Sequence, residues 1–369
     1  MDQDLNCNHG GSGTNGTSSG FVDRGNKWIE SLENVYGNIC AVYSWGLVGT
    51  GVLGVIGNIL IVLVYTTMGF SNTINISYTA LAVSDLCCVL ACVVYGAALI
   101  WIPVQQMPCS QTYQQYGRLF GGYPYLAFSR VTALLTAWIS LERCLCVILP
   151  ARIKLMITHT VTKLALITIF MLACFPLVCL YLAYTSESQF DPNMNVTIKT
   201  VLYDGGVGQS VLQKVALFLF GVVYPTSSGV SVTVCTAVLV VTLKQSTRWR
   251  NLNASGGSTS STDAKNGSTS ESSHIMSTRD VRVTRVVVIV TSVFLVCSLP
   301  TIGQLVANSV FQDYSATGYF TYLYHINGMV AVWVTQLNSS LNIIIFTVSG
   351  QRFRATLLQV LAGRFRARP

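Results

Sequence analysis

The sequence predicts an all-α membrane protein, a bundle of seven transmembrane helices followed by a short amphipathic helix at the membrane surface. The first observation behind this prediction is the mean hydropathy of +0.53, which ordinary soluble domains of this length do not reach. The second is a set of seven apolar stretches, each long enough to cross a bilayer. The third is the lack of the short alternating pattern of a β-barrel, which leaves helices to satisfy the backbone in lipid.

The seven stretches form one predicted membrane domain, residues 41–348, between an N-terminal tail (1–40) and a C-terminal segment (349–369). Within the domain, residues 245–279 are rich in Ser, Thr, Gly and Asn, so they cannot bury enough apolar surface to fold and are predicted to be a flexible loop. The helices are predicted at approximately residues 41–66, 74–102, 119–149, 161–184, 210–244, 282–311 and 320–348.

The distribution of basic residues predicts the orientation of the bundle. With the N-terminus outside, 16 of the 22 Lys and Arg residues lie on the cytoplasmic side, as the positive-inside rule requires. Topology and anionic lipid therefore explain the net charge of +8 without a nucleic-acid partner. We predict a multi-pass protein of the plasma membrane, with Asn15 and Asn195 in extracellular N-glycosylation sequons.

The segment after the seventh stretch has an amphipathic pattern. Apolar residues recur at helical spacing and arginines stand beside them, which predicts a short helix lying flat on the inner membrane surface. The predicted apolar face is formed by Phe353, Leu357, Leu358 and Leu361, flanked by Arg352, Arg354 and Arg364.

Several short motifs occur in a characteristic order along the stretches. They are Gly57-Asn58, Leu81-Ala-Val-Ser-Asp85, Leu141-Glu-Arg-Cys144, Pro225, Cys297-Ser-Leu-Pro300 and Asn338-Ser-Ser-Leu-Asn342-Ile-Ile-Ile-Phe346. Taken together, they resemble the motifs of the rhodopsin-like (class A) G-protein-coupled receptors over the whole membrane region. The stretch from Ser140 to Pro150 resembles chemosensory receptors of gastropod molluscs, which in turn resemble invertebrate receptors for FMRFamide-type neuropeptides.

The resemblance implies a receptor that passes an extracellular signal to a heterotrimeric G protein by movement of the sixth helix. The ligand is expected to be a chemosensory small molecule or, alternatively, a neuropeptide. The sequence departs from the class at Ser298, where an aromatic residue is usual, and at Ile343, which replaces a proline. The usual disulfide to the second outer loop also looks absent or rewired, because that loop has no cysteine; we consider Cys40–Cys109 as a replacement.

Only two carboxylates, Asp85 and Glu142, lie within the apolar stretches. Because a charge in hydrocarbon is costly, such residues usually face the bundle interior and have a function. At the inner end, Arg143 is expected to pair with Glu142 and with Asp280 of the sixth helix, a clamp whose release lets that helix swing outward. The alternative is that Arg143 only extends to the lipid interface. By resemblance, Asn342 and Phe346 belong to the same switch.

Asp85 is a single acid at mid-membrane. The resemblance places other polar side chains near it, and an ionised carboxylate among them is a candidate sodium site; otherwise Asp85 is protonated. Pro225 and Pro300 are expected to bend their helices, with Pro300 a hinge for the sixth. The predicted polar neighbours of Asp85 are Asn58, Thr132, Asn338, Ser339 and Asn342.

The ligand pocket is expected to open outward between the third, fifth, sixth and seventh helices. Tyr125 stands where receptors for biogenic amines carry an aspartate, so a cationic amine would lack its counter-ion. Arg130 is the unusual residue. We expect its side chain to contact a carboxylate or another acceptor-rich ligand; the alternative is hydrogen bonding to helix carbonyls. Further pocket candidates are Tyr95, Ser129, Gln304, Asn308, Trp333 and Gln336.

Other classes of membrane protein fit the sequence less well. An opsin needs a lysine in the seventh helix, and the chain has none after Lys265. The four histidines are scattered, so neither an enzyme nor a metal centre is indicated. A transporter or channel remains the alternative from another class, although the chain shows no repeated, broken helices.

Overall fold

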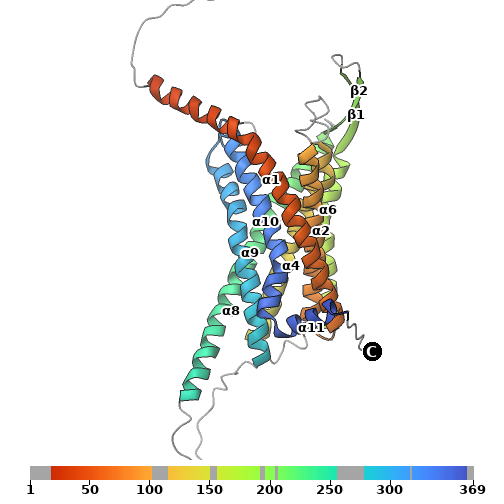
Figure 1. Cartoon of the computed structure of the whole chain (residues 1–369), viewed down its shortest axis with the longest axis vertical. Coiled ribbons are helices and arrows are strands. Elements are labelled where there is room, and N and C mark those ends of the chain that lie inside the picture. The colour runs from red at the N-terminus through yellow and green to blue at the C-terminus, as the bar shows by residue number, and fades with distance from the viewer. Residues whose placement is uncertain are drawn as a thin grey trace, which may run out of the picture.

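The structure, a computed structural model, describes residues 18–101, 115–149, 156–191, 196–203, 207–255, 278–315 and 318–363. Within these ranges, seven helical segments are long and apolar enough to cross a membrane. They run side by side as one bundle (Figure 1). The predicted seven-helix fold is therefore confirmed, and each predicted stretch overlaps one of the seven segments.

The bundle helices follow the order of the chain. The third span combines a π-helical turn, η1, with α4, and the fifth combines α7, the π-helical turn η2 and α8. The elements are α1 (Ser18–Met68), α2 (Thr73–Trp101), η1 (Arg118–Gly122), α4 (Tyr123–Ile148), α6 (His159–Leu182), α7 (Val207–Phe218), η2 (Leu219–Val223), α8 (Tyr224–Ser255), α9 (Thr278–Val310) and α10 (Thr321–Ser349).

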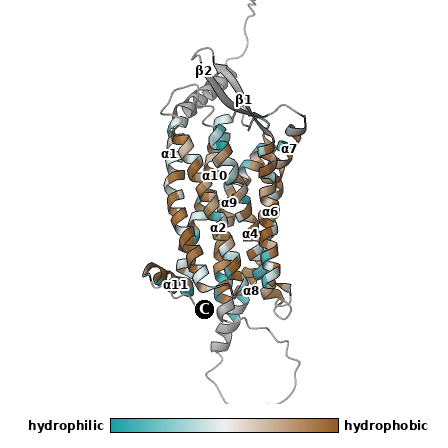
Figure 2. Cartoon of the chain, turned by 90° about the vertical axis from the view of Figure 1, so that its right-hand side faces the viewer, coloured by the Kyte–Doolittle hydropathy of each residue, from teal (hydrophilic) through white to brown (hydrophobic). Residues whose placement is uncertain are grey.

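The outer surface of the bundle is apolar, as Figure 2 shows by the brown colour of the helices. Large apolar side chains such as Leu53 and Met171 are 69% and 70% exposed. Exposed apolar surface on this scale would be a liability in water, whereas in a bilayer it faces hydrocarbon. The distribution fits the predicted membrane environment.

A short helix, α11 (Gln351–Leu361), follows the seventh span and lies across one end of the bundle (Figures 1 and 2). Phe353, Leu357 and Val360 are its buried residues. Leu358 and Leu361 are exposed, although the sequence predicted them on the same face as Phe353. The helical spacing explains the difference. Phe353, Leu357 and Val360, at positions i, i+4 and i+7, point to the bundle, whereas Leu358 and Leu361 lie beside this face.

The opposite end carries an antiparallel β-hairpin, β1 (Tyr184–Asp191) and β2 (Val196–Tyr203), in which Tyr184 pairs with Tyr203. We name the two ends of the bundle the α11 end and the hairpin end. The all-α prediction missed these two strands, which follow α6 and add a small sheet to a helical fold.

The first helix is longer than predicted. It begins at Ser18, whereas the tail was expected to continue to residue 40. The helix continues outward from the bundle because residues 18–40 contain no proline. Hydropathy marks only the part that crosses lipid, so it missed this extension.

Glycines allow α1 to lie close to α10. A Cβ atom added to Gly46 would stand 2.8 Å from the ring of Trp333, and one added to Gly57 would stand 2.9 Å from Ile343. A Cβ atom at Gly54 would overlap the hydroxyl of Ser340. Small residues at such contacts let two membrane helices pack backbone to backbone.

Two prolines directly follow π-helical turns. Pro124 comes two residues after η1, and Pro225 comes two residues after η2. Proline lacks the amide hydrogen that the regular helix needs, and a π-turn accommodates the resulting local mismatch. The π-turn before Pro225 is a local irregularity of the fifth span, and the predicted bend at Pro225 stays a prediction. Pro300 lies inside α9, and its role as a hinge stays a prediction.

Candidate functional site

At the α11 end, Glu142 and Arg143 form a buried ion pair. Arg143 Nη2 lies 2.8 Å from Glu142 Oε1, and the two side chains are 13% and 0% exposed. Thr73 Oγ1 donates a hydrogen bond to the same carboxylate at 2.5 Å, and Ser77 Oγ donates one at 3.2 Å. The acid is thus held by α2 as well as by Arg143. Sequence reasoning predicted the pair but missed the two hydroxyls.

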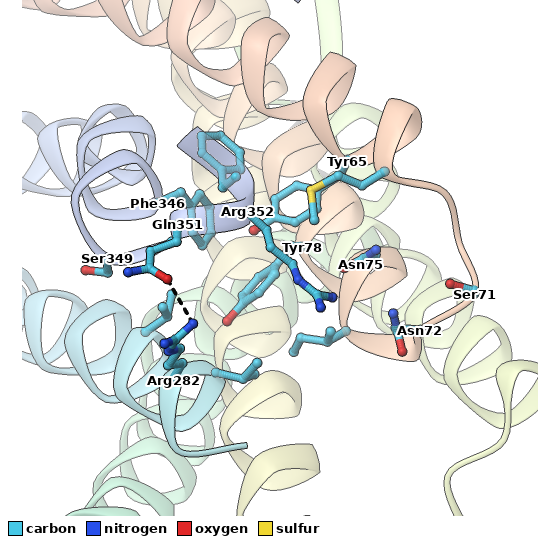
Figure 3. Close-up of a pocket in the computed structure, with 16 residues that line it drawn as sticks. Tyr65, Ser71, Asn72, Asn75, Tyr78, Arg282, Phe346, Ser349, Gln351 and Arg352 are labelled. Carbon is cyan, nitrogen blue, oxygen red and sulfur yellow. Dashed lines mark hydrogen bonds between the residues drawn. The ribbon is translucent and has the colours of Figure 1, made fainter. Parts of the chain in front are cut away.

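Asp280 lies in the first turn of α9, and its side chain is outside the described ones, so its predicted contact with Arg143 remains untested. The hydrogen bond that the structure gives to α9 at this end comes from Arg282. Arg282 Nη1 donates to Gln351 Oε1 of α11 at 2.8 Å (Figure 3). No motif in the sequence predicted this contact, because it joins two segments separated by 69 positions.

A cavity of about 430 Å³ opens at the α11 end between α1, α2, α9 and α11. Its wall is aromatic: Tyr78 lies with its ring centroid 4.8 Å from that of Phe346, and Tyr65 contacts both Phe346 and Phe353. Arg282 and Arg352 line its rim (Figure 3). Phe346 therefore connects α10 to the first two helices.

The polar core at mid-bundle is centred on Asp85, which is fully buried. Thr132 Oγ1 donates to Asp85 Oδ1 at 2.9 Å, and Asn342 Nδ2 donates to Asp85 Oδ2 at 2.7 Å. The contacts join α2, α4 and α10 as predicted.

Two further predicted members of this core, Asn58 and Ser339, belong to the same buried region. Asn58 Nδ2 donates to the carbonyl oxygen of Ser339 at 3.0 Å. Ser339 Oγ lies beside Asp85, yet neither it nor Asn58 Oδ1 has a partner in hydrogen-bonding geometry among the described groups. Asn338 is buried on α10 as well. The core therefore holds two buried oxygens with unused acceptor capacity.

At the hairpin end, a second cavity of about 620 Å³ lies inside the bundle. Four of the predicted pocket residues line it, namely Tyr95, Tyr125, Arg130 and Gln304. Sequence reasoning missed the other lining residues, among them Arg118, Tyr36, Tyr43, Tyr324 and His325. Tyr36 and Tyr43 were overlooked because the first helix was not expected to line the pocket. The seventh helix was expected there, but Tyr324 and His325 near its outer end were not singled out.

The lining of this cavity corrects the predicted location of the pocket. The described lining residues come from the first, second, third, sixth and seventh spans, and none comes from the fifth. An apolar cluster explains this: Phe220 packs with Ala127 and Leu180 and fills the space between the third, fourth and fifth spans. The cavity is consequently displaced toward α1 and α2.

Four predicted pocket residues lie elsewhere. Trp333 Nε1 donates to Thr50 at 3.3 Å and Gln336 Nε2 donates to the Leu47 carbonyl at 2.7 Å, so both side chains point at α1. The close approach of α1 to α10 at the glycines creates these contacts. Ser129 donates to the Leu126 carbonyl within its own helix. Asn308 is exposed and does not line the cavity.

The covalent predictions fall largely outside the described residues. Cys40 lines the hairpin-end cavity and has no disulfide partner among the described cysteines. Cys109, Asn15 and Asn195 lie outside the described part of the chain, so the disulfide and the two glycosylation sites stay predictions. Within that part, no group of three or more His, Cys, Asp or Glu side chains is placed to hold a metal ion.

Fold and site together define a class, a polytopic helical membrane protein with a cavity at one end and a buried charged pair at the other. Residues 57–346 match the family described as 7 transmembrane receptor (rhodopsin family), so the chain belongs to the rhodopsin family of seven-transmembrane receptors. A search of curated proteins finds no match. Members of the family are receptors rather than enzymes; they span the plasma membrane several times and signal through G proteins.

Proposed function

We propose that this receptor detects an extracellular chemosensory cue and passes the signal to a heterotrimeric G protein at the α11 end. The basic residues gathered at that end support a cytoplasmic location for it under the positive-inside rule, with the N-terminus outside. The hairpin end then faces the exterior, and its cavity is the place where a ligand enters.

The single observation that carries this proposal is the buried pair of Glu142 and Arg143. Burying two charges is costly even when they are paired, and leaving one of them buried without its partner costs more. The α11 end therefore prefers the arrangement in which Glu142 and Arg143 are paired. A partner that provides a better environment for the guanidinium competes with Glu142 for it. The pair is therefore an element with two states, and a ligand at the other end biases their populations.

Movement of α9 is the second part of the proposal. The hydrogen bond between Arg282 and Gln351 holds the α11 end of α9 close to the end of the seventh span. An outward swing of α9 must break this bond, which is exposed and therefore contributes modestly. Asp280, in the first turn of α9, is proposed to hold Arg143 in the resting state.

Asp85 is the proposed link between the two ends. The family implies a sodium ion at such a core, and the residues fit one, because hard cations prefer oxygen ligands and the core offers a carboxylate and two unpartnered oxygens. Asp85, Ser339 and Asn58 would hold the ion, which would supply the counter-charge for the carboxylate. In its place, protonation of Asp85 would neutralise the core.

The size of the hairpin-end cavity favours a small ligand over a neuropeptide. A volume of about 620 Å³ falls in the range of pockets that enclose small molecules. The neuropeptide reading remains the alternative within the family, and it would require contacts beyond this cavity.

The test reconstitutes the purified receptor in nanodiscs with a heterotrimeric G protein and measures nucleotide exchange. We expect basal exchange above that of empty nanodiscs, and a loss of about tenfold in Arg143→Ala, equivalent to about 1.4 kcal/mol of coupling. Lys163→Ala, which removes an exposed charge at the same end, is the matched control and should exchange like the parent. Unchanged exchange in a folded Arg143→Ala receptor, or substrate flux in proteoliposomes without exchange, would overturn the proposal.

A further inference from the structure

The hairpin-end cavity is lined by two cations and by no carboxylate among the described side chains. Arg118 projects from η1 and Arg130 from α4, and both line the same cavity. The ion pair that the structure records between described side chains, Glu142–Arg143, lies at the other end of the bundle. The positive charge of this cavity is thus uncompensated by its own walls.

Arg130 is the more informative of the two. Its Nε atom is buried and has no hydrogen-bond partner among the described groups. The same holds for Arg143 Nε, but Arg143 is paired with Glu142, whereas no described carboxylate lines the cavity beside Arg130. A buried donor without a partner costs about 1–3 kcal/mol, and more when it is charged. The helix carbonyls considered as partners in the sequence analysis do not satisfy it. A side chain held at this cost beside an open cavity is suited to an acceptor that arrives from outside.

Arg118 is placed to assist from the mouth of the cavity. It is exposed and lies against the hydroxyl of Tyr95, so it remains hydrated. A hydrated cation at the entrance of a low-dielectric cavity attracts anions and raises their local concentration. The two arginines therefore form an entry site and a deeper site of the same sign.

The remaining walls indicate the body of the ligand. Five tyrosines contribute aromatic faces with hydroxyl groups, and Leu99, Leu126, Met329 and Val332 add apolar surface. Tyrosine combines an apolar ring with one polar tip. The cavity thus suits a compact molecule that is apolar or aromatic at one end and anionic at the other.

We propose that the hairpin-end cavity binds a small organic carboxylate, with Arg130 as the anchoring residue and Arg118 as the entry cation. A guanidinium binds a carboxylate through two parallel hydrogen bonds, and such bonds are about twice as strong as neutral ones. An organic amine meets two like charges in the same cavity and is rejected. The inference deepens the proposed receptor function, on which it rests for its biological meaning.

The test uses the purified full-length receptor in detergent and a panel of aromatic and aliphatic monocarboxylates, each paired with its primary amide and its corresponding amine. Binding is measured as the concentration-dependent rise in the unfolding temperature, since a ligand specific for the folded state raises it. We expect at least one carboxylate to bind roughly tenfold more tightly than its amide, a difference of about 1.4 kcal/mol, and the amines not to bind.

Variants assign the effect to the two arginines. Arg130→Gln should remove the preference for carboxylate over amide, Arg130→Lys should retain part of it, and Arg118→Gln should weaken binding by a smaller factor. Lys214→Gln removes an exposed cation of α7 that does not line the cavity, and it should bind like the parent. A folded Arg130→Gln receptor that keeps the preference, equal binding of amides, or binding of no carboxylate in the panel would overturn the proposal.

The assay needs no G protein, so it separates this inference from the proposed function. Arg130-dependent carboxylate binding without nucleotide exchange would leave the anion site standing and remove the signalling proposal. Exchange that depends on Arg143 without carboxylate binding would do the reverse.

Discussion

The two ends of the bundle treat the same side chain in opposite ways. At the α11 end, Arg143 is paired with Glu142 at 2.8 Å, and hydroxyls from α2 complete the shell of the acid. At the hairpin end, no described carboxylate lines the cavity beside Arg130. The Nε atoms of both arginines are buried without a hydrogen-bond partner among the described groups, so the counter-ion is what distinguishes them. A guanidinium with a carboxylate of its own protein beside it stabilises one conformation, whereas one without such a counter-ion is available to an anion from outside, as proposed above. The comparison distinguishes a charge that stabilises the protein, Arg143, from a charge that is available to a ligand, Arg130.

Removal of one charge at each end should give the largest contrast. Glu142→Ala leaves Arg143 buried and uncompensated, so we expect a loss of about 3 kcal/mol of stability. Arg130→Gln removes a buried charge that has no carboxylate among the described lining residues of its cavity, so its unliganded stability should equal or exceed that of the parent. Thermal unfolding of the purified variants measures both. Asp313→Ala, at an exposed acid, is the control, and equal losses at the two ends would end the comparison.

A milder change at the α11 end should separate stability from signalling. Glu142→Gln keeps an acceptor oxygen for one of the two hydroxyls, Thr73 or Ser77, which donate to different carboxylate oxygens, and removes the charge that holds Arg143. Loss of a charge-assisted bond of about 1.5–3 kcal/mol should raise basal nucleotide exchange by roughly tenfold. Exchange in nanodiscs is the measurement, beside the decrease expected for Arg143→Ala. A decrease in both variants would mean that Glu142 contacts the G protein rather than restrains Arg143.

The proposed sodium site at Asp85, between the two ends of the bundle, can be tested by changing the salt. Replacing potassium chloride by sodium chloride should raise the unfolding temperature of the parent by a few degrees, since a bound ion stabilises the folded state. Asp85→Asn should abolish the difference between the two salts while keeping the oxygen that accepts from Thr132. If the parent unfolds at the same temperature in both salts, the proposed sodium site is ruled out and a protonated Asp85 remains as the alternative.

The smallest expected effect concerns the bond between α9 and α11. Gln351→Leu removes the acceptor of Arg282, and an exposed bond of about 0.5–1 kcal/mol should raise basal exchange two- to fivefold. Gln359→Leu makes the same substitution at another exposed position of α11 and should leave exchange unchanged. If both variants raise exchange equally, the cause is the added apolar surface rather than the lost hydrogen bond.

Much of the fold was predictable because the bilayer imposes it. Long apolar stretches must be helices in lipid, so all seven spans were found from hydropathy, and Asp85 and Glu142 stood out as rare intramembrane acids. The partners of Asp85 on α4 and α10 were anticipated through the resemblance to the receptor class. The pairing of Arg143 with Glu142 followed from their adjacency.

The parts that were not predictable depend on helix rotation and on contacts between distant segments. Trp333 and Gln336 were assigned to the pocket, but the glycines of α1 bring that helix close enough to accept their hydrogen bonds. Phe220 closes the side of the pocket that was expected to be open. Hydropathy carries no information about either effect, because both faces of these helices are apolar.

The π-turns η1 and η2 have a consequence for anyone who compares this chain with other receptors by counting residues. A π-turn adds one residue to a helix, and one residue corresponds to about 100° of rotation. Every side chain on the far side of the added residue is therefore turned by more than a quarter of a circle relative to an unbroken helix. Correspondences counted from Arg143 toward the hairpin end hold as far as Tyr123, and beyond it they must be drawn from coordinates.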